Sequence, residues 1–514
     1  MTKRGDKMVF DVLSQIFAPD MILLVLGGVL MGVVLGAIPG LSGTIGIALL
    51  LPITFNMEPA QAILTLGGIF MGGMYGGSIT AILINVPGDL CATCTAMEGY
   101  PMAKKGKALN ALYYSIFSSM WGGLFGCAAL CLFTPQLAKI ALKFGPPEMF
   151  FCAMCGMAVV ASLSGKNRWK AFFAAAFGML ISMIGMDPIT AVQRFTFGNI
   201  HAMSGISTIP VCIGMFCFAE MFSNIGNKVS NKIYYAKNSV KRTVVLKDVL
   251  RHWKLLIKSS AIGTFVGILP GIGASMAIFL AYGEAKRCSK TSDEVPFGEG
   301  NKEGIIAAES ANNALVGGTM VPMLALGIPG SPTAAMIGSS LTIHGLMCGP
   351  DLFKNSADIA YVFMYGMIIA TLMMALIGTF GVKWFSYILK VKMEYIVPIV
   401  LVFAMFGTYA LNNSMFELGA AIVLGIIGAV FKRFDVPCAP VVIGAVLCDM
   451  VELNMRRSAE LAAIYGQDLF VYIFTRPLAI VLAVIFLFLF VVFFSMGSDK
   501  KKQLKKQVED SMDE

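Results

Sequence analysis

The stretch GVVLGAIPGLSG at residues 32–43 decides the fold, because it interrupts a long apolar run that begins at Met21. Pro39 lacks a backbone hydrogen-bond donor and clashes with the preceding turn, while Gly40 tolerates dihedral angles that other residues avoid. The stretch therefore predicts a helix that breaks within an apolar layer. Hydrocarbon tolerates such a break only where the freed backbone faces protein or a water-filled site.

The pattern recurs as GTFVGILPGIG at residues 263–273. Five landmarks follow one another in the same order in both halves of the chain. Gly32, Gly36, Pro39 and Gly40 correspond to Gly263, Gly267, Pro270 and Gly271 at an offset of 231; Gly76, Gly77 and Ser78 to Gly317, Gly318 and Thr319 at 241; Pro87 and Gly88 to Pro329 and Gly330 at 242; Glu148 to Glu394; and residues 210–214 to 440–444. This order predicts an internal duplication, and paired helix breaks of this kind indicate a transporter binding site.

Composition places the chain in a membrane. Of its 514 residues 57% are hydrophobic and 13% are charged, against about 25% charged residues in soluble domains. The mean hydropathy is +0.77. We therefore expect an all-α, polytopic membrane protein built from two internal repeats that contain broken or re-entrant helices.

The expected segments follow from apolar runs and charge. They are an interfacial segment at 1–20, membrane repeat 1 at 21–225, a basic cytoplasmic loop at 226–258, membrane repeat 2 at 259–470, a final transmembrane helix at 471–496 and a cytoplasmic Lys-rich tail at 497–514. Within repeat 1, residues 44–53 suggest a half-helix and residues 98–107 a surface loop. The region from Lys228 to Lys258 has nine basic residues and one acid, Asp248, and the positive-inside rule makes it cytoplasmic. If one helix separates repeat 2 from a cytoplasmic tail, the two repeats have inverted topology.

The residues that flank the breaks are mostly neutral hydroxyls and amides. Half-helix N-termini attract anions and unwound carbonyls coordinate cations, so this set suits a carboxylate together with Na⁺. The expected substrate-binding residues are Pro39, Gly40, Ser42, Gly43, Thr44, Asn85, Pro87, Gly88, Pro270, Gly271, Gly273, Ser275, Pro329, Gly330, Ser331 and Thr333. The coupling-ion candidates are Ser78, Thr80, Asp89, Ser310, Asn312, Asn313 and Thr319. For the glycines at 67–77, close helix packing is the favoured explanation, and a role in binding is the alternative.

Three charged residues each leave alternatives open. Asp89 follows a break and suits a coupling-ion ligand, a helix cap or an interface residue. Glu309 either pairs with a cation or lies at the water boundary. Arg194 either meets a substrate carboxylate or, as its surroundings favour, anchors the chain at the membrane interface.

Other function classes find little support. The three histidines are dispersed, and the pairs Cys91/Cys94 and Cys152/Cys155 lack further ligands, so we expect no metal site and no cofactor besides Na⁺ or H⁺ as coupling ion. No nucleophile triad, metalloprotease motif or phosphate loop is present, and we expect no enzyme. The basic loop lies between membrane segments, so we expect no nucleic acid partner.

Several ordered motifs give the chain a family resemblance. The segments at 36–52, 74–88 and 98–103 closely resemble the large membrane subunit of tripartite tricarboxylate transporters (the TctA family), as do those at 194–198, 267–274, 309–314, 326–331 and 343–346. The resemblance covers about residues 20–470.

The resemblance implies a multi-pass secondary transporter of the bacterial inner membrane, driven by Na⁺ or H⁺, that takes up citrate or related carboxylates. It also implies a small membrane subunit and a periplasmic solute-binding protein as partners, beside the lipid bilayer and a possible homo-oligomer. A passive anion channel and a non-transporting scaffold or sensor subunit are the alternatives. A channel would not concentrate its substrate, and a scaffold would tolerate Pro39→Ala and Pro329→Ala.

Overall fold

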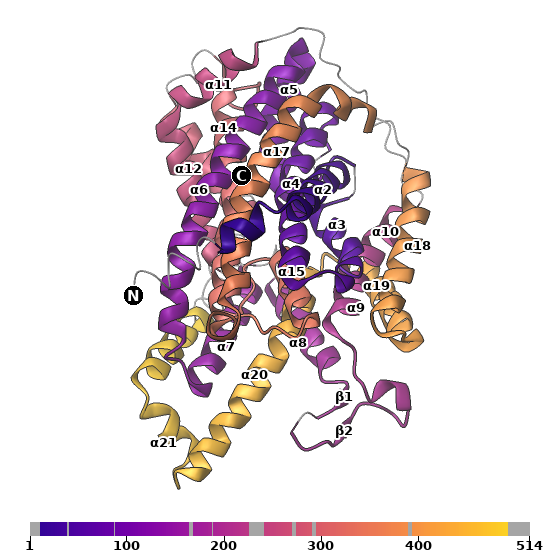
Figure 1. Ribbon diagram of the computed structural model, residues 1–514, viewed down its shortest axis with the longest axis vertical. Helices are drawn as coiled ribbons and strands as arrows, with labels where there is room; N and C mark the ends of the chain where they lie inside the picture. Colours follow the sequence, from indigo (N-terminus) through magenta and orange to yellow (C-terminus); the bar gives the residue numbers. More distant parts are fainter. Residues whose placement is uncertain are drawn as a thin grey trace, which may run out of the picture.

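The protein is an elongated bundle of helices (Figure 1). Its computed structural model describes residues 11–38, 41–86, 88–163, 168–187, 189–225, 241–269, 274–289, 295–388 and 393–491. The strands among these residues are β1 (Gly185–Met186) and β2 (Gln193–Arg194), which pair antiparallel with Gly185 opposite Arg194. The predicted all-α class is thereby confirmed.

The first half contains a short helix at 11–16 and then α2 (Pro19–Gly36), α3 (Gly43–Leu50), η1 (Ile53–Asn56), α4 (Pro59–Ile84), η2 (Leu90–Ala92), α5 (Thr93–Met102), η3 (Ala103–Lys107), α6 (Ala108–Ala141), α7 (Pro146–Leu163), α8 (Arg168–Ser182), η4 (Ile200–Ala202), α9 (Thr208–Cys212), η5 (Ile213–Phe218) and α10 (Ala219–Asn224).

The second half contains α11 (Arg242–Arg251), α12 (Trp253–Ile268), α13 (Ala274–Cys288), α14 (Lys302–Leu326), α15 (Pro332–Ile343), α16 (Pro350–Asn355), α17 (Ala357–Ile388), α18 (Met393–Asn412), α19 (Met415–Arg433), α20 (Ala439–Ile464) and α21 (Leu469–Phe474). A further apolar helix runs over Pro477–Val491.

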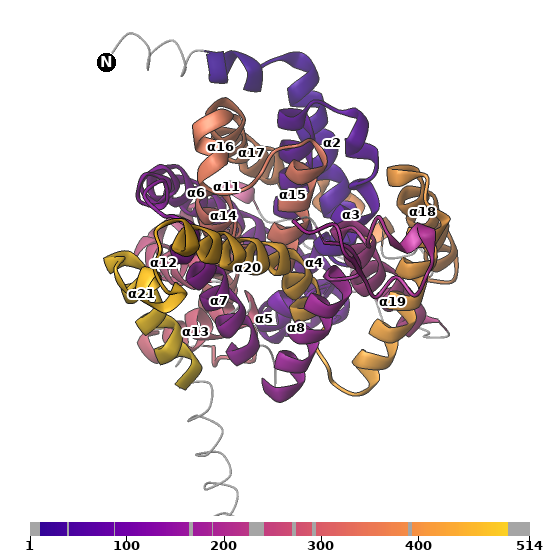
Figure 2. The same cartoon turned by 90° about the horizontal axis from the view of Figure 1, so that it is seen from below.

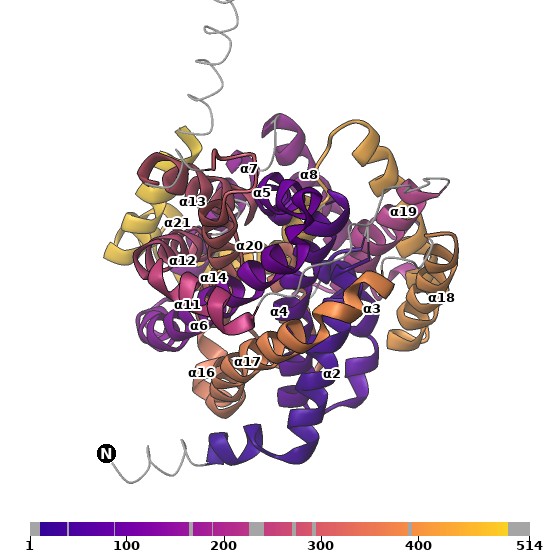
Figure 3. The same ribbon diagram turned by 90° about the horizontal axis from the view of Figure 1, so that it is seen from above.

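Six helices in the described part are long and apolar enough to cross a membrane: Pro19–Gly36, Pro59–Ile84, Thr93–Ala141, Ala357–Val382, Glu394–Asn412 and Met415–Arg433. With this composition the chain is a multi-pass membrane protein. Helix α14 lies at the centre of the bundle, where every residue from Glu303 to Ala325 is buried (Figure 3). Its 25 residues reach about 37 Å, enough to span a hydrocarbon core of about 30 Å.

Glycines bring two pairs of helices into backbone contact. Helix α2 packs along α4 and α12 packs along α14. A Cβ on Gly36 would lie 2.5 Å from the Gly73 carbonyl oxygen, and one on Gly267 would lie 2.9 Å from that of Leu315. At such distances a side chain would force the helices apart, so glycine here permits close approach.

The element order follows the predicted correspondence between the halves. If the chain is duplicated as predicted, α2, α3 and α4 correspond to α12, α13 and α14, and α5 and α6 to α15 and α17. The packing between the halves fits this correspondence, because α6 of the first half packs on α14 of the second, and α17 of the second half packs on α4 of the first. These are the relations that a duplication requires. The duplication itself and its inverted orientation stay predictions.

The prediction of a surface loop at 98–107 is wrong for residues 98–102, which belong to α5, whereas Gly106 with φ 78° breaks the helix between exposed lysines before α6 begins. The Glu98 side chain is fully buried and accepts hydrogen bonds from the Tyr282 hydroxyl (2.6 Å) and from the backbone N–H groups of Gly298 (2.6 Å), Gly300 (2.9 Å) and Asn301 (2.7 Å). Four donors replace the water that a surface carboxylate would bind.

The ends of the bundle carry polar structure. Helix α11 lies in the predicted cytoplasmic loop and is held by Asp248, whose carboxylate binds Lys302 (2.8 Å) and the Tyr114 hydroxyl (2.5 Å). The β1–β2 hairpin projects at the opposite end (Figure 1), and α21 and α18–α19 lie at the periphery when the molecule is viewed from below, where α20 crosses the middle (Figure 2). The final apolar run is interrupted at Arg476, which precedes Pro477 and binds Glu148 at 2.6 Å.

Candidate functional site

Two helices begin at breaks and meet each other near the centre of the bundle. Ser42 caps α3, and its hydroxyl accepts the Ile45 N–H at 3.4 Å. Ser331 caps α15 in the same way, accepting the Ala334 N–H at 3.1 Å. Serine is a preferred N-cap because its oxygen satisfies one of the donors that a helix start leaves open.

A direct hydrogen bond joins these two helix starts. The hydroxyls of Thr44 and Thr333 lie 2.8 Å apart, although 289 residues separate them in the chain. Both are predicted site residues, and each lies two positions after its capping serine. The structure thus brings Ser42, Gly43 and Thr44 of the first half together with Ser331 and Thr333 of the second.

The loops of the second breaks have matching geometry in the two halves. The Gly88 N–H donates to the Gly77 carbonyl at 3.2 Å, and the Gly330 N–H donates to the Thr319 carbonyl at 3.4 Å. A Cβ on Gly88 would lie 2.6 Å from the Gly36 carbonyl oxygen, and one on Gly330 would lie 2.7 Å from that of Gly267. Each loop therefore rests against the helix that precedes the first break of its own half.

The helices that lead into these loops also end alike. Asn85 closes α4 with φ 58° and Gly327 closes α14 with φ 75°, both in the left-handed region. Asparagine and glycine are the residues that adopt this conformation most readily at a helix end. After the turn, Asp89 accepts the Cys91 N–H at 3.4 Å, as a capping residue would, and Pro329 is buried.

Other predicted substrate residues are spread between described and undescribed segments. Ser275 is the second residue of α13 and half-buried, and α13 contacts η2 and α5 just after the first half's second break. Pro39, Gly40, Pro87, Pro270, Gly271 and Gly273 lie outside the described residues.

Three of the coupling-ion candidates hydrogen-bond to carbonyl groups of their own helix. The hydroxyls of Thr80, Ser310 and Thr319 donate to Gly77, Ile306 and Val316 carbonyls at 2.9, 2.7 and 3.0 Å. The amide of Asn312 donates to the Met74 carbonyl at 3.4 Å, and that of Asn313 lies 3.3 Å from the sulfurs of Met71 and Met374. The Ser78 hydroxyl and the side-chain carbonyl oxygens of Asn312 and Asn313 are buried without a hydrogen-bond partner.

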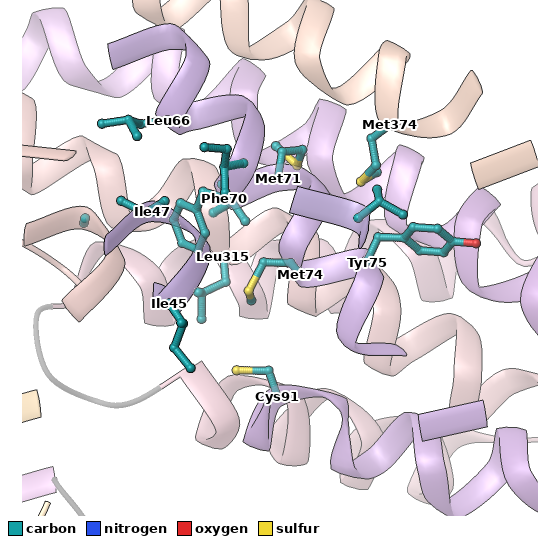
Figure 4. Close-up of a cluster of buried hydrophobic side chains, with 14 of the residues drawn as sticks. Ile45, Ile47, Leu66, Phe70, Met71, Met74, Tyr75, Cys91, Leu315 and Met374 are labelled. Carbon is teal, nitrogen blue, oxygen red and sulfur yellow. The ribbon is translucent and has the colours of Figure 1, made fainter. Parts of the chain in front are cut away.

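Apolar side chains fill the space between the breaks and the bundle interior. Ile45 and Ile47 of α3 pack with Phe70, Met71 and Met74 of α4 and with Leu315 of α14 (Figure 4). Met71 and Met374 point toward each other, and Cys91 lies beside Met74 and Ile45 in the same view. This packing keeps lipid away from the breaks, as the freed backbone requires.

Two of the three ambiguous charged residues are now placed. Arg194 binds both oxygens of Glu452 at 3.0 and 2.7 Å and also pairs with Asp187, which in turn binds Arg456 at 2.7 Å. The Arg194 guanidinium is thus bound by the Glu452 and Asp187 carboxylates of the protein itself. Glu309 is 0% exposed, so it lies in the interior and not at the water boundary.

Sequence reasoning missed several polar residues of the interior. Ser115, Ser118 and Ser119 of α6 are fully buried, and Ser119 donates to Glu309 at 2.7 Å. Ser115 and Ser119 are four residues apart and therefore lie on one helix face, which was a usable signal. Without knowledge that α6 packs on α14, that face could not be paired with Glu309.

Chemically, the first break of the first half and the second break of the second half together offer two helix N-termini and two hydroxyls within contact of each other. Helix N-termini carry partial positive charge and open N–H groups, which suit a carboxylate. Residues that could hold a metal through three or more His, Cys, Asp or Glu side chains do not cluster anywhere in the described part of the chain.

Comparisons with known proteins agree with the resemblance. The model of the "Tripartite tricarboxylate transporter TctA family" matches residues 22–443. An Agrobacterium vitis protein described as "Uncharacterized 52.8 kDa protein in TAR-I ttuC' 3'region" is 35% identical over 456 residues, which cover 88% of this chain and 89% of that protein. A second one, "Uncharacterized protein in TAR-II ttuC' 3'region", is 33% identical over 38% of this chain and 80% of its own length. No solved structure matches.

Proposed function

Because the chain belongs to the tripartite tricarboxylate transporter TctA family, we propose that it is the large membrane subunit of an ion-gradient-driven carboxylate transporter. In this proposal it takes up a tricarboxylate or a related carboxylate across the bacterial inner membrane, together with a small membrane subunit and a periplasmic solute-binding protein. Na⁺ or H⁺ is the coupling ion, and the protein acts as a transporter and not as an enzyme.

One observation carries the placement of the substrate. The N-termini of α3 and α15 come from opposite halves of the chain and meet at the Thr44–Thr333 hydrogen bond. Two helix dipoles directed at one point favour an anion there without a fixed positive charge in the membrane. A substrate carboxylate would replace this hydrogen bond with bonds to both hydroxyls and to neighbouring N–H groups.

The proposed mechanism is alternating access. Because the site is assembled from both halves, a movement of one half against the other opens it to one side of the membrane and then to the other. The glycine contacts at Gly88 and Gly330 fix each loop to its own half. Each loop would then move with its own half, while the contact between α3 and α15 and the packing of α6 on α14 and of α17 on α4 would rearrange.

The decisive experiment is uptake into proteoliposomes that contain the three-component complex. We expect labelled carboxylate to accumulate when an inward Na⁺ or H⁺ gradient is imposed, and accumulation to stop when both gradients are collapsed. Concentrative uptake that persists without either gradient would refute ion coupling. Flux that only equilibrates the carboxylate would identify a passive channel.

A variant pair tests the site itself. Thr333→Val removes the hydroxyl that meets Thr44, whereas Thr342→Val removes an exposed hydroxyl on the same helix that bonds only to the Gly338 carbonyl. We expect the first to weaken stabilisation of the purified protein by a panel of carboxylates and the second to leave it unchanged. Equal behaviour of the two variants would argue against a substrate site at α15.

A further inference from the structure

Glu309 is a carboxylate at the centre of the protein. It lies on α14, is 0% exposed and accepts hydrogen bonds from the Thr95 hydroxyl at 2.5 Å and the Ser119 hydroxyl at 2.7 Å. Each carboxylate oxygen thus has one hydroxyl donor. Thr95 belongs to α5 and Ser119 to α6, and they are 214 and 190 positions from Glu309 along the chain.

Two more hydroxyls face the same carboxylate. Ser78 of α4 and Ser115 of α6 lie beside the Glu309 carboxyl group. Both side chains are fully buried, and neither hydroxyl comes within full hydrogen-bond distance of an acceptor. A buried hydroxyl without a full hydrogen bond costs roughly 1–3 kcal/mol, so both oxygens beside the carboxylate are available to a ligand.

Charge identifies the kind of ligand. Among the residues that the structure describes, no lysine, arginine or histidine pairs with Glu309. An isolated carboxylate in a membrane interior is strongly disfavoured, and such groups are neutralised by a cation or mark an ion pathway. One carboxylate and four hydroxyls provide a single negative charge and only oxygen ligands, which is the donor set of a small hard cation.

The position of Glu309 connects it to the helix breaks. Ser78 directly follows Gly77, whose carbonyl holds the Gly88 N–H, and Thr95 lies in the first turn of α5 after the same break. A cation bound here would draw α4 and α5 together across that loop. Counting back 241 or 242 residues from Glu309 reaches Gly68 or Gly67, so the equivalent place in the first half has no carboxylate.

We propose that Glu309, Ser78, Thr95, Ser115 and Ser119 bind one sodium ion at the junction of α4, α5, α6 and α14. Binding requires the hydroxyl hydrogens of Thr95 and Ser119 to turn away from the carboxylate, so that all four hydroxyl oxygens face the ion. The coupling role of this ion rests on the proposed transport function, whereas the binding itself does not.

The test is thermal unfolding of the purified full chain as NaCl replaces choline chloride at constant ionic strength and without carboxylate. The wild-type midpoint is expected to rise and to saturate with Na⁺. Glu309→Gln keeps the shape of the side chain, removes its charge and is expected to abolish the rise. If Glu309→Gln or Ser115→Ala keeps the wild-type half-saturating Na⁺ concentration, the site is refuted.

Two serines on α6 make a matched pair for this test. Ser115→Ala removes a proposed ligand that has no hydrogen bond without Na⁺, so it should leave the Na⁺-free midpoint unchanged and raise the half-saturating concentration about tenfold or more. Ser118 is equally buried and unbonded but does not face Glu309, and Ser118→Ala should leave Na⁺ binding as it is. A merely structural role for Ser115 would leave the two variants alike.

The outcomes separate this site from the transport function. A wild-type midpoint that ignores Na⁺ but rises on acidification, with that rise absent in Glu309→Gln, would overturn sodium in favour of a proton. If the three-component complex accumulates carboxylate while the midpoint of the chain does not respond to Na⁺, the sodium site is refuted and the transport function is not. If Na⁺ stabilises the chain but the complex transports no carboxylate, the transport function is refuted and the sodium site is not.

Discussion

Gly88→Ala and Gly330→Ala are expected to damage the protein to the same extent. An added Cβ at Gly88 would lie 2.6 Å from the Gly36 carbonyl oxygen and 2.7 Å from the Gly77 Cα, and one at Gly330 would lie 2.7 Å from the Gly267 carbonyl oxygen. Ordinary contacts are 3.4–4 Å. The opposing atoms belong to the backbone, so no side-chain rotation can relieve the overlap.

The expected cost follows from three terms. Overpacking of this kind costs about 1–3 kcal/mol, and moving the loop away weakens the Gly88–Gly77 hydrogen bond, worth roughly 0.5–1.5 kcal/mol. Burial of one methyl group returns about 0.8 kcal/mol. We therefore expect each variant to lose about 2 kcal/mol of stability and to unfold a few degrees earlier.

The assay is the thermal midpoint of purified variants in detergent, with and without a saturating carboxylate. Gly27→Ala is the control, because an added Cβ there meets nothing within 4 Å. We expect the control to be neutral or slightly stabilising, since alanine favours a helix more than glycine does. Two results would contradict the reasoning: a tolerated alanine at Gly88, or damage at only one of the two equivalent glycines.

Three further predictions concern particular side chains. In a double-mutant cycle of Thr44→Val and Thr333→Val, each single change should cost about 1 kcal/mol of carboxylate binding, and the double change little more than one; strictly additive losses would show that the two hydroxyls act separately. Glu98→Ala leaves the Tyr282 hydroxyl and three backbone N–H groups without their acceptor. It should cost more than about 3 kcal/mol of the free energy of unfolding and lower the unfolding midpoint further than Glu98→Gln does; equal midpoints of the two variants would refute that role. Cys288 is the exposed cysteine of the chain, so a maleimide reagent should label it first, and Cys288→Ser should remove the fast phase, while a persistent fast phase would place another thiol at the surface.

The helix breaks were predictable because they depend on local chemistry. Proline and glycine restrict or release the backbone wherever they occur, and a serine just after such a break predicts a helix start. The structure places helix caps at Ser42 and Ser331, as expected from these rules. The same rules account for the left-handed ends at Asn85 and Gly327.

Long-range partners were not predictable from one sequence. Residues 98–107 contain proline, glycine and three lysines, which favour a loop, yet Glu98 is buried because partners 184 to 203 positions away reach it. The hydroxyls around Glu309 are equally remote, at 190 and 214 positions. Local propensity cannot reveal which helix faces will meet, and tertiary hydrogen bonds overrode it here.

The exchange of partners between the halves constrains how substrate and ion can communicate. In the first half α3 meets α15 of the second at Thr44 and Thr333, and α13 of the second half contacts η2 and α5 of the first. Thr95 of that same α5 reaches Glu309. A cation that reorganises the hydroxyls at Glu309 therefore acts on the helix that follows the first half's second break, while a carboxylate between α3 and α15 acts on the second half's equivalent break. Since both breaks pack on α4 and α14, we propose that occupancy of one site would change the strain at the other, so that coupling would need no direct contact between ion and substrate.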